Sequence, residues 1–285
     1  MSDAMDFDFD YRTRPGSGPL APIVESVWFA RGTVPYRRER IAPTGSTVAI
    51  VVLGDPIVQI GDDGRGARHV ADRGSLIGPH DGPIVNEPQG ETHAVGIVTT
   101  PIGCAAAFGV APASIRGEVV DLDPVWSPAR ALRQELLRLD DPDAKVDLVV
   151  DRLSSSIRPL TDREVTVGRA VDLVLADPTR PIPDVADAIG WSPGHLSRVF
   201  ADVVGLTPRV LARLLRLRRL LHDLDVHGEI RWSELAVEWG WCDQAHLIRD
   251  LKRHVGVTPA QYVEAQAIYR GVEDSEPAGF VPEPG

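Results

Sequence analysis

Cysteine is scarce in this sequence: Cys104 and Cys242 are the only two among 285 residues. They lie far apart and form neither a disulfide framework nor the paired spacing of a zinc site, which favours a reducing cytoplasm. Long apolar runs are also missing, because no stretch approaches the ~20 residues that span a bilayer. The acidic start, residues 1–6, lacks the features of a signal peptide. We therefore expect a cytoplasmic protein without membrane contact.

An excess of positive charge is missing as well, and the formal net charge of −11 argues at first sight against nucleic-acid binding. The distribution weakens that argument. Residues 1–160 carry 16 basic and 22 acidic side chains, residues 161–270 carry 14 and 15, and residues 271–285 carry four acids and no base. From Arg198 to Arg219 there are six arginines and one acid, Asp202. Local charge governs phosphate attraction, so this segment suits DNA, the alternative being an ordinary solvated helix face.

A short pattern occurs twice between residues 182 and 262. Ala186 and Gly190 recur 50 residues later as Ala236 and Gly240. The second part of the pattern recurs 51 residues later, so that Leu196, Arg198, Gly205, Thr207 and Pro208 correspond to Leu247, Arg249, Gly256, Thr258 and Pro259. Each copy predicts a helix, a tight turn at the first glycine, and a second helix capped by Ser192 or Asp243. Such a helix pair reads DNA when its second helix enters a major groove.

Two units of this kind, each closing with Gly-x-Thr-Pro, resemble the C-terminal domain of AraC/XylS-type transcription regulators. The resemblance covers residues 163–267, and the turn of the second unit is one residue longer, as in that family. Leu211, Leu251 and Ala201 stand where the family often has tyrosine, phenylalanine and lysine. The resemblance implies a sequence-specific regulator, whose candidate partners are double-stranded DNA, a small-molecule effector, RNA polymerase and a second copy of the chain.

The two second helices contain the candidate residues for reading bases. Arg198 and Arg249 occupy matching places, where each can bond guanine, clamp a phosphate, or form an intradomain salt bridge with Asp202 or Asp250. Gln244 suits adenine. The predicted base-reading residues are Gly194, His195, Ser197, Arg198, Gln244, Ala245, Ile248 and Arg249.

Phosphate contacts are expected from helix N-termini and from a basic stripe. A long helix over residues 208–225 joins the two units, and its arginines at 209, 213 and 216 share one face. Threonines at helix starts can hold phosphate together with the backbone N–H groups that follow, or can simply cap the helix. The predicted phosphate-binding residues are Ser192, Thr207, Arg209, Arg213, Arg216, Lys252, Arg253 and Thr258.

The first half of the chain predicts β-strands. Apolar segments at residues 47–53, 57–60, 75–77, 83–85 and 95–99 are bounded by glycine, proline and aspartate, and residues 23–30 suit a strand or a short helix. Short strands with little helix are typical of a small antiparallel barrel or sandwich, and we prefer a cupin-like sensor barrel. The expected fold class is α+β, with an all-α tandem helix-turn-helix domain at the C-terminus.

Helical spacing returns after the predicted strands. Two amphipathic helices within residues 126–158 are expected either to form dimer contacts or to cover the β core. The chain is expected to begin with a flexible lead-in or short edge strand at 1–20, followed by a β-rich sensor domain at 21–125. A helical dimerisation or linker segment at 126–160 then leads to a DNA-binding domain at 161–269, whose first helix is expected at 162–176. The predicted last segment is an acidic disordered tail at 270–285.

Signals for enzyme chemistry are few. His69, His80 and His93 fall in the β region, but they lack the close His-x-His spacing usual in metal cupins. Cys104 has no identifiable partner that would activate it, so a buried small apolar residue is expected. The sequence predicts no catalytic residue, cofactor or metal. Two alternatives remain: a metal-dependent cupin enzyme with an accessory DNA-binding domain, and an interaction protein whose helix pairs no longer bind DNA.

Overall fold

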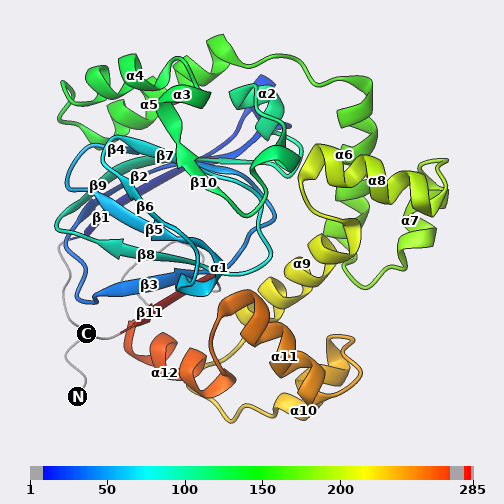
Figure 1. The fold of residues 1–285 in the computed structure, drawn as a ribbon. Helices are drawn as coiled ribbons and strands as arrows, with labels where there is room; N and C mark the ends of the chain where they lie inside the picture. The colour runs from blue at the N-terminus through cyan, green and yellow to red at the C-terminus, as the bar shows by residue number, and fades with distance from the viewer. Residues whose placement is uncertain (1–8, 270–278, 284–285) are drawn as a thin grey trace.

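The computed structural model describes residues 9–269 and 279–283. Two antiparallel sheets form its β-rich half, which consists of the N-terminal part of the chain and one strand from the C-terminal end (Figure 1). The six-stranded sheet has the order β1 (Phe9–Pro15), β2 (Val24–Gly32), β9 (Thr92–Thr99), β4 (Val48–Val52), β7 (Gly74–Ile77) and β10 (Val119–Asp121). The five-stranded sheet has the order β11 (Phe280–Glu283), β3 (Arg38–Ile41), β8 (Ile84–Pro88), β5 (Ile57–Ile60) and β6 (Arg68–Ala71). These sheets and the helical second half confirm the α+β class.

Helices cover the outer face of the six-stranded sheet. In α4 (Ala129–Leu136) and α5 (Pro142–Ser156), Leu132, Leu136 and Leu153 are fully buried in one cluster with residues of β2, β4, β7 and β9. The two helices thus cover the β core, which is one of the two roles expected for them. The remaining short turns of this half are η1 (Gly18–Leu20), α1 (Gly61–Gly64), α2 (Cys104–Phe108), η2 (Pro112–Ile115) and α3 (Leu122–Val125).

Both ends of the described chain add edge strands. β1 pairs with β2 from Phe9↔Gly32 onward, so of the two structures expected for residues 1–20 the short edge strand is confirmed for residues 9–15, and the flexible lead-in is wrong for them. β11 pairs with β3, and Val281 is buried at 2% exposure, so the prediction of a disordered tail is wrong for residues 280–283. Backbone pairing and burial of apolar side chains stabilise both strands. The other residues predicted as lead-in and tail, 1–8, 270–278 and 284–285, lie outside the described ranges.

The helical half consists of two groups joined by one long helix, α9 (Pro208–Asp223), which runs between them in Figure 1. The first group is α6 (Asp162–Ala176), α7 (Ile182–Ala188) and α8 (Pro193–Val204), and the second is α10 (Trp232–Glu238), α11 (Gln244–Val255) and α12 (Pro259–Tyr269). Leucines of the first half of α9 pack in the first group, and leucines of its second half pack in the second. A shared helix fixes the orientation of one group relative to the other.

The cores of the two helical groups also take in residues from the β-rich half. Ile102 joins the core of the first group, while Ala42 and Val281 join that of the second. The side chain of Leu211 on α9 lies close to the backbone of Gly45. Packing therefore crosses the predicted domain boundaries, which remain predictions.

The N-terminus of α6 is fixed by a buried carboxylate. Thr161 and Glu164 form a reciprocal capping box, and both guanidinium NH groups of Arg158 donate to Glu164, at 2.8 and 2.6 Å. The hydrogen bonds from Arg158, helped by those from Thr161, outweigh the effect of burial and lower the pKa of Glu164 from 4.5 to about 2. Glu164 is therefore ionised at neutral pH and attaches the linker to the first helical group.

Glu164→Gln is expected to lower the free energy of unfolding at pH 7 by about 2 kcal/mol, because it removes charge-assisted hydrogen bonds from a buried site. The folded-state pKa is depressed, so this stability is present above about pH 4.5 and is lost as the pH falls towards about 2. Urea unfolding at pH 7 and pH 3 should show the difference shrinking by more than half. Glu135→Gln, at an exposed pair with Arg152, is the control and should cost less than about 1 kcal/mol. An equal difference at both pH values would contradict this interpretation.

Candidate nucleic-acid interface and effector cavity

The first helix-turn-helix unit consists of α7 and α8. Gly190 adopts a φ of 75° in the turn, which a side chain would strain, and the Ser192 hydroxyl accepts from the backbone N–H of His195 at 3.3 Å. Leu196 and Phe200 of α8 are fully buried against Ala186 and other core residues of α7. The opposite face of α8 is left to solvent, and on it Gly194, His195 and Arg198 are exposed, while Ser197 is half-buried.

The second unit, α10 and α11, repeats this construction. Gly240 has a φ of 80°, and the Asp243 carboxylate accepts from the backbone N–H of His246 at 2.6 Å. Leu247 and Leu251 are fully buried with Ala236. The outward side chains of α11 agree with the predicted ones, in that Gln244, Ala245 and Arg249 are exposed and Ile248 is half-buried.

Arg198 and Arg249 are both exposed on their helices, and neither forms the intradomain salt bridge considered as an alternative. Asp202 pairs with Arg163 at 2.5 Å, and Asp250 pairs with Arg213 and Arg216 of α9, both at 3.7 Å. Within the described part of the chain, Arg198 contacts the ring of His195 at 3.2 Å, and no ion pair is found for Arg249. Both guanidinium groups are therefore accessible for a ligand outside the protein.

The arginine stripe on α9 is not uniform. Arg209 is exposed, and Arg213 is 38% exposed, with its Nε 3.7 Å from Asp250. Arg216 is only 15% exposed, stacks 4.0 Å from the ring centroid of Trp241, and donates to the carbonyl of Gly240 at 2.8 Å. This corrects the predicted stripe, because Arg216 packs inward against the second unit.

Asp250 pairs with Arg216, whereas the sequence indicated it only as a possible partner of Arg249. Its carboxylate is 5% exposed and accepts from the indole N–H of Trp241 at 2.9 Å, with the guanidinium groups of Arg213 and Arg216 both at 3.7 Å. A buried carboxylate requires such partners. The sequence does contain an indication of this pairing, because Asp250 is next to Leu251 on the inward face of α11. A carboxylate buried there needs a basic partner.

The predicted phosphate-binding hydroxyls all cap helices. Thr207 accepts from the N–H of Val210 at 3.4 Å at the start of α9, and Thr258 exchanges hydrogen bonds with Gln261 at the start of α12. Because the backbone N–H of Thr258 already donates to the Gln261 side chain at 2.9 Å, that N–H is occupied in this structure. Capping is confirmed for both threonines and for Ser192, while their role towards phosphate remains a prediction.

Arg253 and His254, at the end of α11, contact the β-rich half. The Arg253 guanidinium donates to Asp81 Oδ2 at 2.9 Å, and the His254 ring bonds the Asp81 carbonyl oxygen. Burial raises the pKa of Asp81, but the hydrogen bond and charge of Arg253 outweigh it, and the net pKa is lowered. Arg253 was predicted to bind phosphate; here its charge is shared with Asp81, although the side chain remains 58% exposed.

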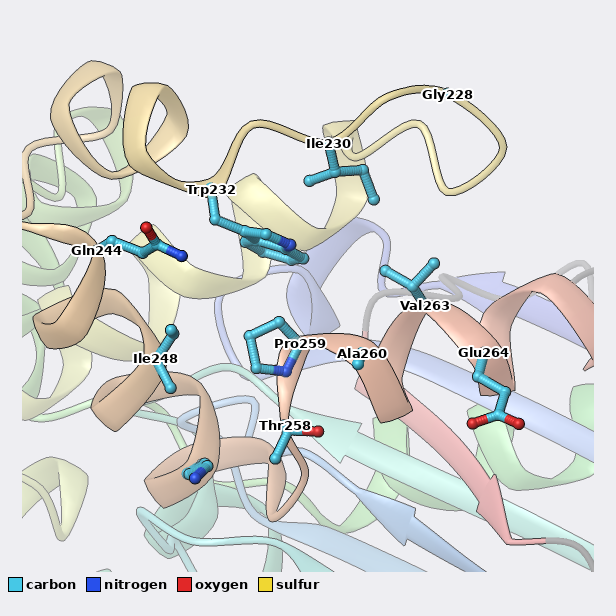
Figure 2. A pocket seen from close by; sticks show the side chains of 11 residues that line it. Gly228, Ile230, Trp232, Gln244, Ile248, Thr258, Pro259, Ala260, Val263 and Glu264 are labelled. Carbon is cyan, nitrogen blue, oxygen red and sulfur yellow. The ribbon is translucent and has the colours of Figure 1, made fainter.

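A groove of about 700 Å³ follows one flank of α11. Figure 2 shows Gln244 and Ile248 on one side of it, with Trp232 and Ile230 above and Pro259 of α12 below. Lys252, one turn after Ile248, also lines the groove. Gln244, Ile248 and Lys252 thus border a hollow, whereas Ala245 and Arg249 lie on the adjacent stripe of the helix.

A second cavity, of about 280 Å³, lies in the β-rich half and is lined by residues of both sheets. Its walls are mostly apolar and include the aromatic residues Phe9, Tyr11, Trp28, Tyr36 and Phe280. Arg218 of α9 reaches the cavity from the helical half. Apolar walls with a few polar groups are typical of small-molecule sites. The sequence prediction named no ligand residues, because the cavity joins strands that are distant in the chain.

The three histidines considered for a metal lie on separate elements. His69 is 3.5 Å from Asp121, His93 packs edge-on against Phe29, and His80 follows β7 in a loop. In the described ranges, no three histidine, cysteine or acidic residues come together as a metal site. Cys104 is buried, and burial raises its pKa to about 11, which suppresses the thiolate. Among the described helices, none is long and apolar enough to cross a membrane.

Comparisons with known proteins agree with these observations. A family model described as a helix-turn-helix domain matches residues 165–265, and one described as a domain of unknown function, DUF6597, matches residues 12–121. The probable transcription factor PqrA of Proteus vulgaris is 35% identical over 85 residues, which make up 29% of this chain and 67% of that protein.

Two groups of solved structures are also similar. ToxT from Vibrio cholerae has 11% sequence identity and a TM-score of 0.46, covering 90% of this chain and 98% of that one. A transcriptional regulator with an AraC-type DNA-binding domain, from Chromobacterium violaceum, has 24% identity and a TM-score of 0.33, covering 38% of this chain and 96% of that one.

Two helix-turn-helix units with exposed second helices, together with a transcription factor as a relative, define a DNA-binding transcription regulator. The chain belongs to the AraC/XylS-type family of these regulators, as its repeated motifs implied. It therefore falls in a family of regulators rather than of enzymes.

Proposed function

We propose that α8 and α11 enter two successive major grooves of one DNA duplex and read its sequence. The observation that carries this proposal is the matching exposure of Arg198 and Arg249, which occupy equivalent places on two equally built units. Successive major grooves lie ~34 Å apart along the duplex, so a fixed connection such as α9 is needed to align two reading helices.

The proposed contacts follow the exposed side chains. Arg198 and Arg249 bond guanine, and Gln244 bonds adenine, because these pairings match the donors and acceptors of the base edges. Arg209, Lys252 and the capped helix starts at Thr207 and Thr258 hold phosphates, with Arg213 as a further contact. The remaining proposed base contacts are Gly194, His195, Ser197, Ala245 and Ile248, and the remaining proposed phosphate contacts are Ser192 and Arg253.

The β-rich half serves in this proposal as the sensor. A small molecule in the cavity of about 280 Å³ would favour one packing of the β-rich and helical halves and so shift the population that binds DNA. The cavity supports this because Arg218 of α9 contributes to its wall. The regulator acts in the cytoplasm as a homodimer and contacts RNA polymerase, as the family resemblance implies.

Selection of bound genomic fragments tests the proposal. The fragments should share a motif with two conserved patches separated by about one helical turn. Retrieval of fragments without a common motif would contradict sequence-specific reading, even if the protein binds them tightly.

Arg209→Ala is expected to weaken binding to all DNA sequences about equally, because a phosphate contact carries no sequence information. The slope of log affinity against log salt should become shallower by about 1, since one fewer phosphate is neutralised. Fluorescence anisotropy at several salt concentrations measures both. Arg130→Ala, on α4, removes the same charge from an exposed position and serves as the control. If the salt dependence of Arg209→Ala has the same slope as that of the control, Arg209 does not contact a phosphate.

A further inference from the structure

One short segment, residues 78–82, contacts the effector cavity and both reading units. His80 lines the cavity. Asp81, the next residue, bonds Arg253 and His254 at the end of α11. Pro79 lies against Gly205, the glycine that ends α8, so closely that a Cβ atom on Gly205 would be 2.9 Å from the proline ring. Three consecutive residues therefore touch the cavity, the first unit and the second unit.

The chemistry of the cavity is set by the ring of His80. Its Nδ1 lies 2.8 Å from the carbonyl oxygen of Gly78, which can only accept, so Nδ1 carries the proton. Burial lowers the pKa of His80 and outweighs the opposing effects of Gly78 and Asp81, so the ring is neutral at pH 7. Nε2 is then an acceptor, and this buried atom has no hydrogen-bond partner within the described residues. A buried acceptor without a donor is costly, and a ligand that enters the cavity beside the ring and moves the atoms covering Nε2 can supply the donor.

The walls around this acceptor favour an aromatic occupant. Tyr11 and Trp28 are stacked with ring centroids 6.4 Å apart, and Tyr36 and Phe280 form an edge-to-face pair at 5.6 Å. All four line the cavity. Aromatic walls give a flat apolar ligand both burial and ring contacts.

We propose that the cavity binds a small aromatic molecule carrying a hydroxyl or amine, that this group donates a hydrogen bond to His80 Nε2, and that residues 78–82 relay occupancy to α8 and α11. The relay rests on the proposed DNA-binding function, whereas the ligand assignment does not. Holding His80 through the ligand restrains Pro79 and Asp81, which contact the ends of both reading helices. By linkage, DNA must change ligand affinity by the same factor as the ligand changes DNA affinity.

Binding of three matched probes to the full-length protein, measured by titration calorimetry without DNA, tests the ligand assignment. 4-Ethylphenol has the donor, 4-ethylanisole lacks it, and 4-ethylbenzoate replaces it with an anion. The phenol should bind about tenfold more tightly than the anisole, as expected for one hydrogen bond to a buried acceptor. Equal binding of phenol and anisole, tightest binding of the benzoate, or no binding at all would overturn the assignment.

Two variants at His80 keep the test specific. His80→Asn retains a donor for the Gly78 carbonyl but lacks an atom in the place of Nε2, and should abolish the preference for the phenol. His80→Gln carries an acceptor that reaches about as far as Nε2, so this variant should keep most of the preference for the phenol. If His80→Asn still prefers 4-ethylphenol over 4-ethylanisole, the phenol does not bond to His80 Nε2.

The relay is tested at Asp81. Asp81→Asn weakens the bond to Arg253 without touching the cavity, so 4-ethylphenol should bind unchanged while its effect on DNA affinity falls several-fold. An undiminished effect would overturn the relay. If the wild-type protein binds the phenol with the stated preference but binds no DNA, the proposed function fails and the ligand assignment stands.

Discussion

Operator affinity is expected to fall roughly thirtyfold to twenty-thousandfold when Arg198 and Arg249 are both replaced by alanine. Each residue, if bonded bidentately to guanine, contributes ~1–3 kcal/mol of discrimination, and every 1.4 kcal/mol corresponds to a factor of ten. The two arginines lie on separate units with separate cores, so their effects should add in free energy. Binding to DNA of unrelated sequence should fall much less.

Anisotropy titrations of the single and double variants against a selected operator and a scrambled duplex measure this effect. Both side chains point away from the cores, so the variants should keep the unfolding midpoint of the wild-type protein. Arg130→Ala controls for the loss of charge. Equal losses on operator and scrambled DNA would show that these arginines bind phosphate rather than bases.

Arg216→Ala is expected to have the largest effect on stability, lowering the free energy of unfolding by about 3 kcal/mol. The substitution removes the stacking on Trp241 and the hydrogen bond to Gly240, and it leaves the Asp250 carboxylate buried with fewer partners. Arg216→Lys should recover only part of the loss, because an ammonium group cannot reproduce the planar fork. Urea unfolding at neutral pH measures both variants.

The neighbouring Arg213 supplies the control for Arg216. It approaches the same carboxylate at 3.7 Å but is 38% exposed, so Arg213→Ala should cost less than about 1 kcal/mol. In Arg216→Ala, Asp250→Asn should restore part of the stability, since the unpaired charge is then gone. Equal destabilisation by Arg213→Ala and Arg216→Ala would contradict the account of the buried site.

Local signals in the sequence were enough for much of the helical half. Helix α6 occupies the residues predicted for it, because Thr161 and Glu164 form a capping box next to an amphipathic run. The left-handed glycines Gly190 and Gly240 mark both turns, as predicted. These features depend on residues within one or two helical turns of each other, so the sequence displays them directly.

The features that were missed depend on distant packing. β11 pairs with β3 across most of the chain, and no local pattern in a short segment rich in proline and glycine indicates such a partner. Arg209 and Arg216 look equivalent on the helix, and only the docking of Trp241 distinguishes them. The cavity and the contact between Asp81 and Arg253 likewise join segments that are unrelated in sequence.

A methylation-protection footprint on a selected operator reports which guanines are covered in the major groove, and so shows whether α8 and α11 both read bases. We expect two protected patches on one face of the duplex, about 10 to 11 base pairs apart, with Arg198→Ala removing protection from one patch and Arg249→Ala from the other. A single patch, or two patches on opposite faces, would contradict the proposed reading by both helices.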